Sequence, residues 1–383
     1  MRGACGRHGG RTGAQTHFVL HALRVALQTG PGDRLNLSKG MEMRGQNSIL
    51  RYSNALAGTL STLALLAAAH GSAVAQGGAS TAQPRETPAS MVDALHAAFG
   101  EHHARAVHTK GVMFEGTFTP SPEARAITRA SIFFGGPLPV VARFSLFAGV
   151  PDLPDNDDGA APTGFAVKIK GPDGDDFDLE LNQHSRFIVA TFDEFAVFLR
   201  AVGASGPAVP HPNPVEQFLA AHPDAAAFLA TRTYPASFAQ ATYFGVNSLK
   251  FTDGHGQSAF VRYRARPRAG ERYLSIDQRK AMSATYLHDE IAERASREPI
   301  VFDWYAQVAE SGDKIDDPSI AWPEDRRMVK LGTFTLTSTP SNPESAQRRL
   351  LFLPGKPHAG VEPADPMLVL RNSAYPISFA QRQ

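Results

Sequence analysis

Residues 164–181, GFAVKIKGPDGDDFDLEL, are the stretch that decides the predicted fold. Apolar residues occupy alternate positions in 164–170 and again in 176–181, which is the pattern of a β-strand with one buried face. A turn-forming segment, 172–174 (PDG), separates the two runs. The stretch therefore predicts an antiparallel hairpin.

Further strands and helices are predicted on both sides of this hairpin. Strands are expected at 140–147 (VVARFSLF), 248–251, 258–264 and 330–338 (KLGTFTLTS). Helices are expected at 88–103, with Thr87 as its N-cap, and at 192–202, 214–220, 224–231 and 283–293. Because the strands do not alternate regularly with helices, the sequence predicts an α+β fold built on antiparallel strands.

Composition narrows the classes of protein that the chain can belong to. The 383 residues carry a formal net charge of +1, and 43% of them are hydrophobic. This balance argues against a nucleic-acid-binding protein, which needs an excess of basic residues to contact phosphates. It also argues against a disordered chain and a polytopic membrane protein. The single cysteine, Cys5, excludes a disulfide scaffold and a structural zinc site.

The N-terminal region predicts export. An apolar run at 55–69 follows Arg44 and Arg51 and precedes the small residues Ala73-Val74-Ala75. This order is typical of a signal peptide, and the run is short for a membrane anchor or a buried helix, the competing interpretations. We expect a signal peptide at 41–75, cleaved after Ala75, and a periplasmic protein without a stable membrane anchor. Residues 1–40 are interpreted as upstream translation from a mis-assigned start, and 76–383 as a single domain.

Three segments carry residue types suited to chemistry. On a strand, Arg143 and Ser145 share one face, so a core-facing pair would need partners. Arg371 and Tyr375 are four residues apart, so on a helix the guanidinium reaches the phenol oxygen. A cation there lowers the pKa of the phenol and favours phenolate, a known axial ligand of haem iron. Pro376 disfavours helix at Tyr375. Taken alone, His108 is interpreted as a satisfied histidine between a helix and a strand.

The order of these segments resembles the haem catalase family. The similar blocks are 105–111 (RAVHTKG), 142–145 (ARFS), 163–168 (TGFAVK), 177–183 (FDLELNQ) and 357–375, within a resemblance that covers roughly 88–383. The chain ends eight residues after Tyr375. It therefore resembles the small catalase-related peroxidases. The resemblance implies an eight-stranded antiparallel β-barrel with surrounding helices and a haem b cofactor.

The resemblance also implies a role for individual residues. His108 is expected to be the distal acid/base group, and Ser145 to orient it. Tyr375 is expected to be the iron ligand, with Arg371 as its charge partner. The remaining cofactor-binding residues implied by the resemblance are Arg105, Arg143 and Arg382 at the haem propionates and Phe195 near the haem.

One position departs from the family pattern. The match to the distal catalytic asparagine falls on Gln183, with Asn182 one position earlier. Both are candidate catalytic residues. Gln183 has a longer side chain that can still donate a hydrogen bond, and because neighbouring strand residues face opposite sides, Asn182 can replace it only through a bulge or a register shift. This departure puts efficient disproportionation of hydrogen peroxide in doubt.

The expected function is a haem peroxidase in oxidative-stress defence. It would reduce hydrogen peroxide or organic hydroperoxides with a small organic electron donor, and have weak or partial catalase activity. The alternatives are a true catalase, a non-enzymatic periplasmic haem-binding barrel, and an enzyme that rearranges fatty-acid hydroperoxides. The last is disfavoured because Val107, not threonine, precedes His108. A homo-oligomer is left open.

Overall fold

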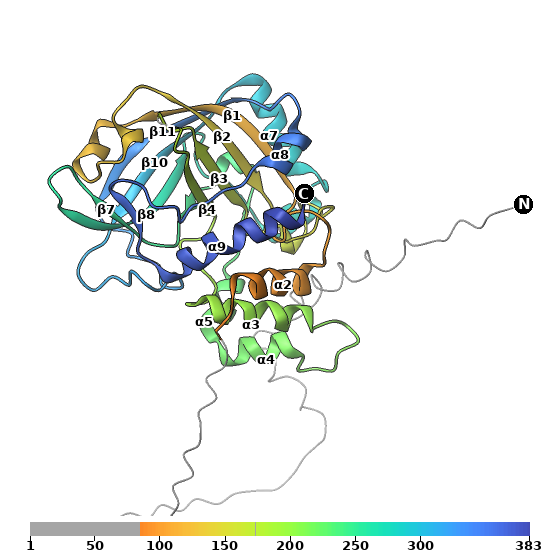
Figure 1. Ribbon diagram of the computed structural model, residues 1–383. Coiled ribbons are helices and arrows are strands. Elements are labelled where there is room, and N and C mark those ends of the chain that lie inside the picture. Colours follow the sequence, from red (N-terminus) through yellow and green to blue (C-terminus); the bar gives the residue numbers. More distant parts are fainter. Residues whose placement is uncertain (1–84, 173) are drawn as a thin grey trace, which may run out of the picture. The chain divides into compact units, whose positions relative to one another are not determined.

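The computed structural model describes residues 85–172 and 174–383 (Figure 1). The predicted upstream segment at 1–40 and the predicted signal peptide at 41–75 lie outside these residues. Within the described part, residues 86–383 belong to one compact unit. No helix in this part is both long and apolar enough to cross a bilayer.

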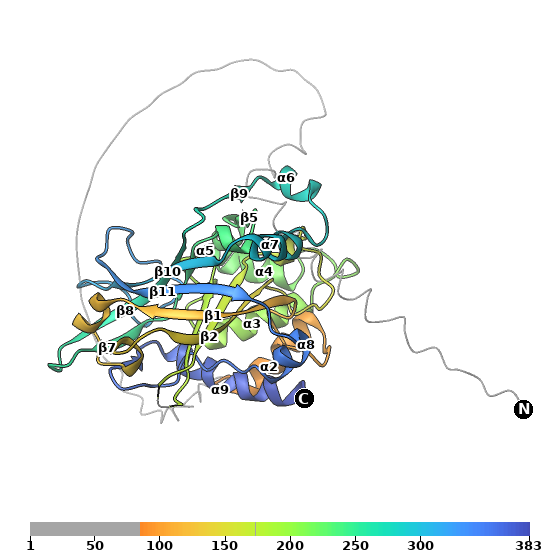
Figure 2. The same ribbon diagram turned by 90° about the horizontal axis from the view of Figure 1, so that it is seen from above.

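Eight antiparallel strands close into a barrel, as the family resemblance implied. Their order around the barrel is β10, β11, β1, β2, β3, β4, β6 and β8, and β8 pairs back with β10. The eight are β1 (Gly111–Pro120), β2 (Leu138–Ser145), β3 (Gly164–Ile169), β4 (Phe177–Asn182), β6 (Tyr243–Phe244), β8 (Ser258–Pro267), β10 (Ile300–Val308) and β11 (Met328–Ser338). Figure 2 shows β11, β1 and β2 side by side.

Four short strands lie outside the ring. β7 (Leu249–Thr252) and β12 (Val361–Pro363) extend the sheet beyond β8, while β5 (Tyr234–Pro235) and β9 (Tyr273–Leu274) form a separate pair. The hairpin predicted from 164–181 is present as β3 and β4. β1 and β10 were not predicted. Two glycines in β1 weaken the sequence pattern of a strand. Gly116 is needed there because a Cβ would lie 2.1 Å from the carbonyl oxygen of Thr335 on the neighbouring strand.

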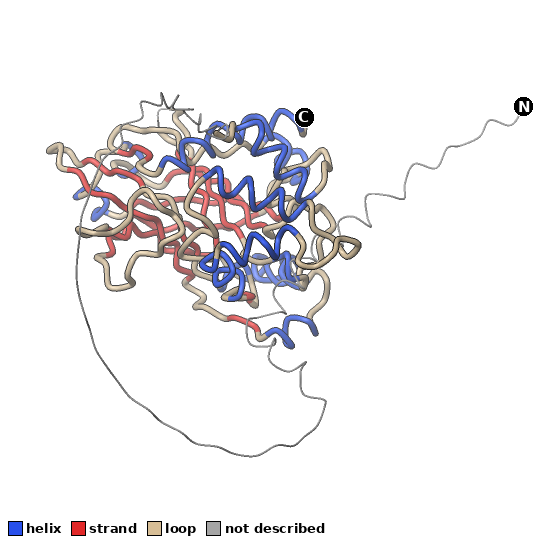
Figure 3. Tube along the Cα trace, turned by 90° about the horizontal axis from the view of Figure 1, so that it is seen from below, coloured by secondary structure: helices blue, strands red, loops and turns tan. Residues whose placement is uncertain are grey.

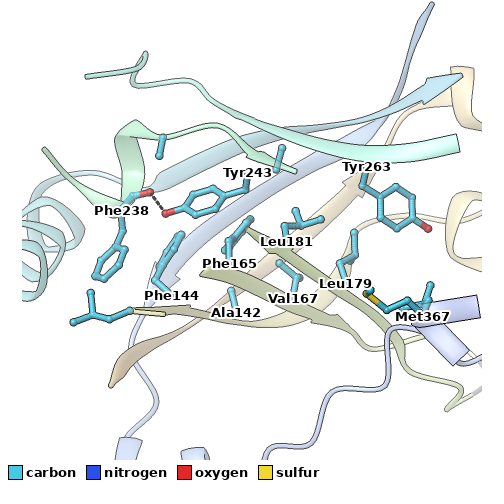
Figure 4. Close-up of a cluster of buried hydrophobic side chains, with 14 of the residues drawn as sticks. Ala142, Phe144, Phe165, Val167, Leu179, Leu181, Phe238, Tyr243, Tyr263 and Met367 are labelled. Carbon is cyan, nitrogen blue, oxygen red and sulfur yellow. Dashed lines mark hydrogen bonds between the residues drawn. The ribbon is translucent and has the colours of Figure 1, made fainter. Parts of the chain in front are cut away.

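Aromatic side chains fill the interior of the barrel (Figure 4). The ring centroids of Phe144 and Phe165 are 4.7 Å apart and stacked, and those of Phe165 and Phe302 are 4.8 Å apart. Each such side chain contributes about 1.5–3 kcal/mol through burial. Because side chains alternate along a strand, the opposite side chains of β2, β3 and β4 face outward.

The helices lie outside the barrel, and several of them pack on one another. They are α2 (Pro88–Phe99), α3 (Phe192–Gly203), α4 (Pro214–Ala221), α5 (Pro223–Ala230), α6 (Ile276–Ala281), α7 (Tyr286–Arg297), α8 (Pro343–Arg349) and α9 (Pro366–Gln381). Short 3₁₀ turns occur at Pro122–Ala126, Ser131–Phe133, Asp158–Ala160 and Phe238–Gln240. Figure 3 shows many of these helices gathered beside the strands. In Figure 1 α9, α2, α3 and α4 form successive layers at the foot of the barrel.

Two helices differ from their sequence-based predictions. α2 begins as expected, with a capping box between Thr87 and Ser90. It ends at Phe99 and not at 103, because Gly100 adopts a φ of 86° and leaves the helical conformation. α9 runs through Pro376, although this proline was expected to disfavour helix at Tyr375. Local preference is overridden there by the contacts of Tyr375 with other elements.

Candidate active site

Strands β2, β3 and β4 present one row of three residues on the outer face of the barrel. Ser145 pairs with Gly164, and Gly164 pairs with Asn182, without irregularity in either ladder. All three residues line a cavity between the barrel and the helices α2, α3 and α9. The strand register therefore brings a hydroxyl and a side-chain amide to opposite sides of a glycine.

His108 lies over the glycine of this row. Its Nδ1 atom is 3.1 Å from Ser145 Oγ. A Cβ on Gly164 would lie 2.9 Å from that same Nδ1 atom and 2.8 Å from Ser145 Oγ, so a larger residue would displace the imidazole. The imidazole is also in edge contact with the ring of Phe147, at 5.6 Å between centroids. The close approach of the histidine thus requires glycine at position 164.

The backbone at His108 is in the left-handed region. Its φ is 55°, which costs a residue with a side chain about 1–2 kcal/mol. Its N–H donates to the carbonyl oxygen of Phe147 at 2.8 Å. Arg143 donates from Nη1 to the carbonyl oxygen of His108 and from Nη2 to that of Thr109, both at 2.8 Å. Arg143 therefore holds the loop that carries the histidine.

His108 is neutral at physiological pH. Burial is the largest effect, and together with the charges of Arg143 and Arg371 it lowers the pKa of His108 to about 4, against an opposing effect of Glu180. A neutral imidazole can accept a proton. His108 is therefore suited to act as a general base, and, once protonated, as the acid that gives the same proton to another atom of the substrate.

Asn182 and Gln183 face opposite sides, and Asn182 is the one on the cavity side. No bulge or register shift is needed, contrary to expectation, because the regular β3–β4 ladder already places Asn182 outward. Its Oδ1 accepts from the N–H of His184 at 2.8 Å, and within the described chain its Nδ2 has no partner. Gln183 bonds instead to Thr163 Oγ1 and Thr233 Oγ1, both at 2.8 Å, and among the described residues it does not line the cavity.

A second row on the same strands meets α9. Arg143 pairs with Ala166, and Ala166 pairs with Glu180. The hydroxyl of Tyr375 donates to Glu180 Oε2. Arg371 donates from Nη2 to the phenol oxygen at 2.5 Å and also to Glu180 Oε2. The contact expected from the four-residue spacing is present, and Glu180 adds a partner that sequence reasoning missed.

The pKa of Tyr375 moves in the opposite direction to the one expected. Burial is the largest effect and raises it, and the charge of Glu180 raises it further. Arg371 lowers it, as predicted, but does not outweigh the other two. The phenol therefore keeps its proton at neutral pH unless a cation replaces that proton. The pKa of Arg371 itself is raised despite the lowering effect of burial, because Tyr375 and Glu180 are close.

Three arginines at one end of the cavity lack acidic partners. Arg105 and Arg382 both donate from Nη2 to the carbonyl oxygen of Leu350, at 2.7 and 2.6 Å, and Arg143 donates from Nε to Gln347 Oε1 at 3.0 Å. In the described ranges none of the three forms an ion pair, and the Nε atom of Arg382 is buried without a partner. Burial, and next the charge of Arg382, lower the pKa of Arg143 to about 9. Such a cluster fits an anionic ligand.

Most of the remaining cavity wall is apolar. α2 and α3 contribute Met91, Val92, Leu95, Phe99, Phe192, Phe195, Phe198, Leu199 and Val202. Phe195 lines the cavity as expected and packs against Phe187, with centroids 4.8 Å apart. Apolar walls, a phenol on one element and unpaired arginines at one end fit a haem, which is a flat apolar group with two carboxylates on one edge. Glu180 could have been noticed in the sequence, because it lies two residues before Asn182 and so shares its face.

Comparisons with known proteins identify the family of the chain. The Catalase family model matches residues 91–383. A catalase-related peroxidase of Synechococcus elongatus is 34% identical over 304 residues, covering 77% of this chain and 88% of that protein. A catalase-related peroxidase of Mycolicibacterium paratuberculosis is 32% identical over 302 residues, covering 77% of this chain and 95% of that protein.

Solved structures show the same fold at lower identity. Catalase A from Saccharomyces cerevisiae superposes with a TM-score of 0.64 at 19% identity, covering 73% of this chain and 61% of that one. A bacterial catalase gives a TM-score of 0.63 at 20% identity, covering 73% and 57%. The chain thus spans less than two thirds of the length of these catalases, but most of the length of the two peroxidases. It belongs to the catalase family, and within that family it groups with the small catalase-related peroxidases.

Proposed function

We propose that this protein is a haem-dependent peroxidase that reduces hydrogen peroxide or organic hydroperoxides with an organic electron donor, in defence against oxidative stress. The observation that carries the proposal is the neutral His108 held over Gly164 between Ser145 and Asn182, in the same cavity as Tyr375. The two catalase-related peroxidases reported above support it. The chain is an oxidoreductase that acts on peroxide.

The cavity residues divide between holding haem b and moving protons. Tyr375 would provide the phenolate ligand and Arg371 its counter-charge, while Arg105, Arg143 and Arg382 would bind the two carboxylates. A bound haem would supply the iron centre that accepts and passes on electrons.

The proton transfers belong to the protein. Ser145 bonds to Nδ1 of His108, so Nε2 is the nitrogen available to the cavity. Being neutral, His108 takes a proton from one peroxide oxygen and returns it to the other, which makes water a good leaving group. The Nδ2 group of Asn182 is placed to donate a hydrogen bond to a peroxide oxygen. Reduction of one O–O bond consumes two electrons and two protons, which the organic donor provides.

The first test is spectroscopic. The full chain, expressed with haem supplied, should give the absorption spectrum of five-coordinate ferric haem with a phenolate ligand. Tyr375→Phe should lose that spectrum and retain less haem. A wild-type spectrum in that variant, or a chain that does not take up haem, would contradict the proposal.

The second test separates the reactions that the family allows. Peroxide consumption is measured with and without a phenolic donor. We expect consumption to depend largely on the donor. Donor-independent consumption with oxygen release would indicate a true catalase, and a haem-loaded chain that consumes no peroxide would indicate a haem-binding barrel.

We further propose that the protein is exported through a signal peptide at 41–75. The support is the apolar run at 55–69 between basic residues and the Ala73-Val74-Ala75 segment. N-terminal sequencing of the periplasmic protein should begin at Gln76. A protein that remains in the cytosol with Arg2 or Arg44 at or near its N-terminus would overturn this proposal.

A further inference from the structure

Arg232 is a cavity residue that neither the sequence analysis nor the proposed reaction uses. It follows α5 and donates from Nη1 to the carbonyl oxygen of Asp158 at 2.9 Å. The next residues of that segment, Gly159 and Ala160, accept backbone hydrogen bonds from Ala148 and Phe147. Phe147 in turn accepts from the N–H of His108 at 2.8 Å. Arg232 therefore belongs to the wall that carries the distal histidine.

A second connection ties Arg232 to Asn182. Gln183, the residue after Asn182, donates from Nε2 to the side-chain and backbone oxygens of Thr233, at 2.8 and 3.1 Å. Its Oε1 accepts from Thr163, just before β3. Gln183 thus joins the strand end that carries Asn182 to the segment that carries Arg232. The segment that carries Arg232 is therefore fixed by two contacts, one with Asp158 and one with Gln183.

The guanidinium of Arg232 has no ion pair with a carboxylate in the part of the chain that the structure describes. Its Nε atom is buried without a hydrogen-bond partner. The nearest acid, Asp158, bonds through its carboxylate to the guanidinium of Arg279, which is also buried, and to Tyr234. The Asp158 carboxylate thus contacts Arg279, whereas Arg232 bonds to the backbone carbonyl of the same residue. Arg232 lines the cavity, and among the described residues its Nε–H donor is left for a ligand.

On its cavity side, Arg232 has apolar neighbours, whereas its other side faces Asp158 and Arg279. Phe228 and Leu229, from the last turn of α5, line the cavity beside it, and Phe187 also lines the cavity. Arg105 and Arg382 donate to Leu350 and so belong to a different wall. A ligand that satisfies Arg232 would therefore combine an apolar body with one carboxylate.

We propose that Arg232 is a carboxylate-binding residue on the His108 side of the cavity, and that the protein prefers apolar organic acids over their neutral analogues. This inference rests on the proposed function, because it names the class of organic substrate for the same site. The carboxylate could belong to an organic hydroperoxide or to the electron donor. Both sources share the chemistry that Arg232 recognises.

Equilibrium binding provides the direct test. Isothermal titration calorimetry on the haem-loaded full chain compares 4-isopropylbenzoate with the neutral 4-isopropylbenzamide. We expect the acid to bind about tenfold more tightly, the gain expected from one charge-assisted pair. Arg232→Gln should abolish this preference, and Arg232→Lys should retain part of it. An unchanged preference in Arg232→Gln, or none in the wild type, would overturn the proposal.

Arg186→Gln is the matched control. The guanidinium of Arg186 lies 5.7 Å from the centroid of the Phe228 ring, so this variant removes the same charge from the same region. Arg186 does not line the cavity within the described ranges. The preference should therefore persist in this variant. Equal losses in both variants would mean that general positive charge, and not contact with Arg232, produces the preference, which would overturn the proposal.

Kinetic measurements identify the source of the carboxylate. KM is measured for cumene hydroperoxide and its para-carboxylate, and separately for the donors p-cresol and 4-hydroxyphenylacetate. The pair whose KM ratio collapses in Arg232→Gln identifies the substrate that Arg232 contacts. If neither ratio changes, Arg232 is not a substrate-binding residue. If the wild type does not consume peroxide at all, the proposed function fails, while the calorimetric comparison still decides the role of Arg232.

Discussion

The two faces of β2, β3 and β4 contrast within one short stretch of chain. The inner face carries Phe144, Phe165 and Leu181, which pack in the barrel (Figure 4). The outer face carries Ser145 and Asn182, which line a cavity. The inner side chains are apolar and pack against one another. The outer side chains are polar, and part of their hydrogen-bonding capacity remains available to a ligand.

The outer face has a cost in stability. Buried arginines that form no ion pair within the described part of the chain, and a left-handed residue, His108, are unfavourable arrangements that a stable fold must offset. The packed barrel provides that stability. Ser145 and Asn182 therefore lie one residue away from the packed core, on the same strands that build it, and His108 and Tyr375 are brought to this face by a loop and by α9.

Removal of the distal imidazole should give the largest effect. We expect His108→Ala to lower peroxide turnover by roughly 10²–10⁴-fold, the usual contribution of a positioned acid/base group. Haem content and the free energy of unfolding should change little, because the imidazole lies on the outer face. Near-normal steady-state turnover in this variant would contradict the role of His108.

A core truncation should show the reverse pattern. Phe165→Ala should lower the free energy of unfolding by about 3–5 kcal/mol, because it leaves a hole in the stacked aromatic cluster. Urea denaturation measures the change. Turnover per folded molecule should fall much less than in His108→Ala. If stability were unaffected, the inner face would not be the source of it.

Gly164→Ala tests the point where the two faces meet. The added Cβ would lie 2.8 Å from Ser145 Oγ and 2.9 Å from His108 Nδ1, so the imidazole must move. We expect a loss of about 1–3 kcal/mol in stability together with a tenfold or greater loss of turnover. Gly135→Ala is the matched control, because an added Cβ there meets no atom within 4 Å and the residue does not line the cavity among the described residues; it should retain turnover. Full activity in Gly164→Ala would exclude close packing of His108 on this strand.

The pH dependence of stability should reveal the neutral histidine. The pKa of His108 is about 4 in the folded chain and near 6.5 when unfolded, so unfolding takes up a proton between these values. The contribution of His108 to the free energy of unfolding should therefore be fully present above about pH 6.5 and decrease as the pH drops toward 4. His108→Gln should flatten this slope. Identical slopes for the two proteins would show that the histidine does not titrate in this window.

Much of the fold could be predicted from local pattern. The alternation in 164–181 predicted β3 and β4, and the four-residue spacing of Arg371 and Tyr375 predicted their contact. The end of α2 was predicted less well. The sequence pattern predicted a helix as far as residue 103, but the backbone at Gly100, with a φ of 86°, leaves the helical conformation and ends α2 at Phe99.

The site required information that local pattern does not carry. Glu180 is 195 residues before Tyr375, and only the fold brings them together. The pKa of Tyr375 rises because burial and Glu180 outweigh Arg371, the one partner visible in the sequence. Likewise, the regular β3–β4 register, and not residue type, placed Asn182 outward and Gln183 inward.

The sequence by itself determined which side chains alternate on each strand, which residues share a helix face and which segments resemble catalases. These features depend on neighbours within a few residues, where geometry is set by the backbone period. The tertiary structure alone decided that His108 lies on Gly164, that Glu180 meets Tyr375 and that Arg232 lines the cavity with no ion pair to a carboxylate among the described residues. Burial and charge at those places depend on strands and helices that are distant in the chain, and their effects on pKa and binding arise only when those elements are packed together.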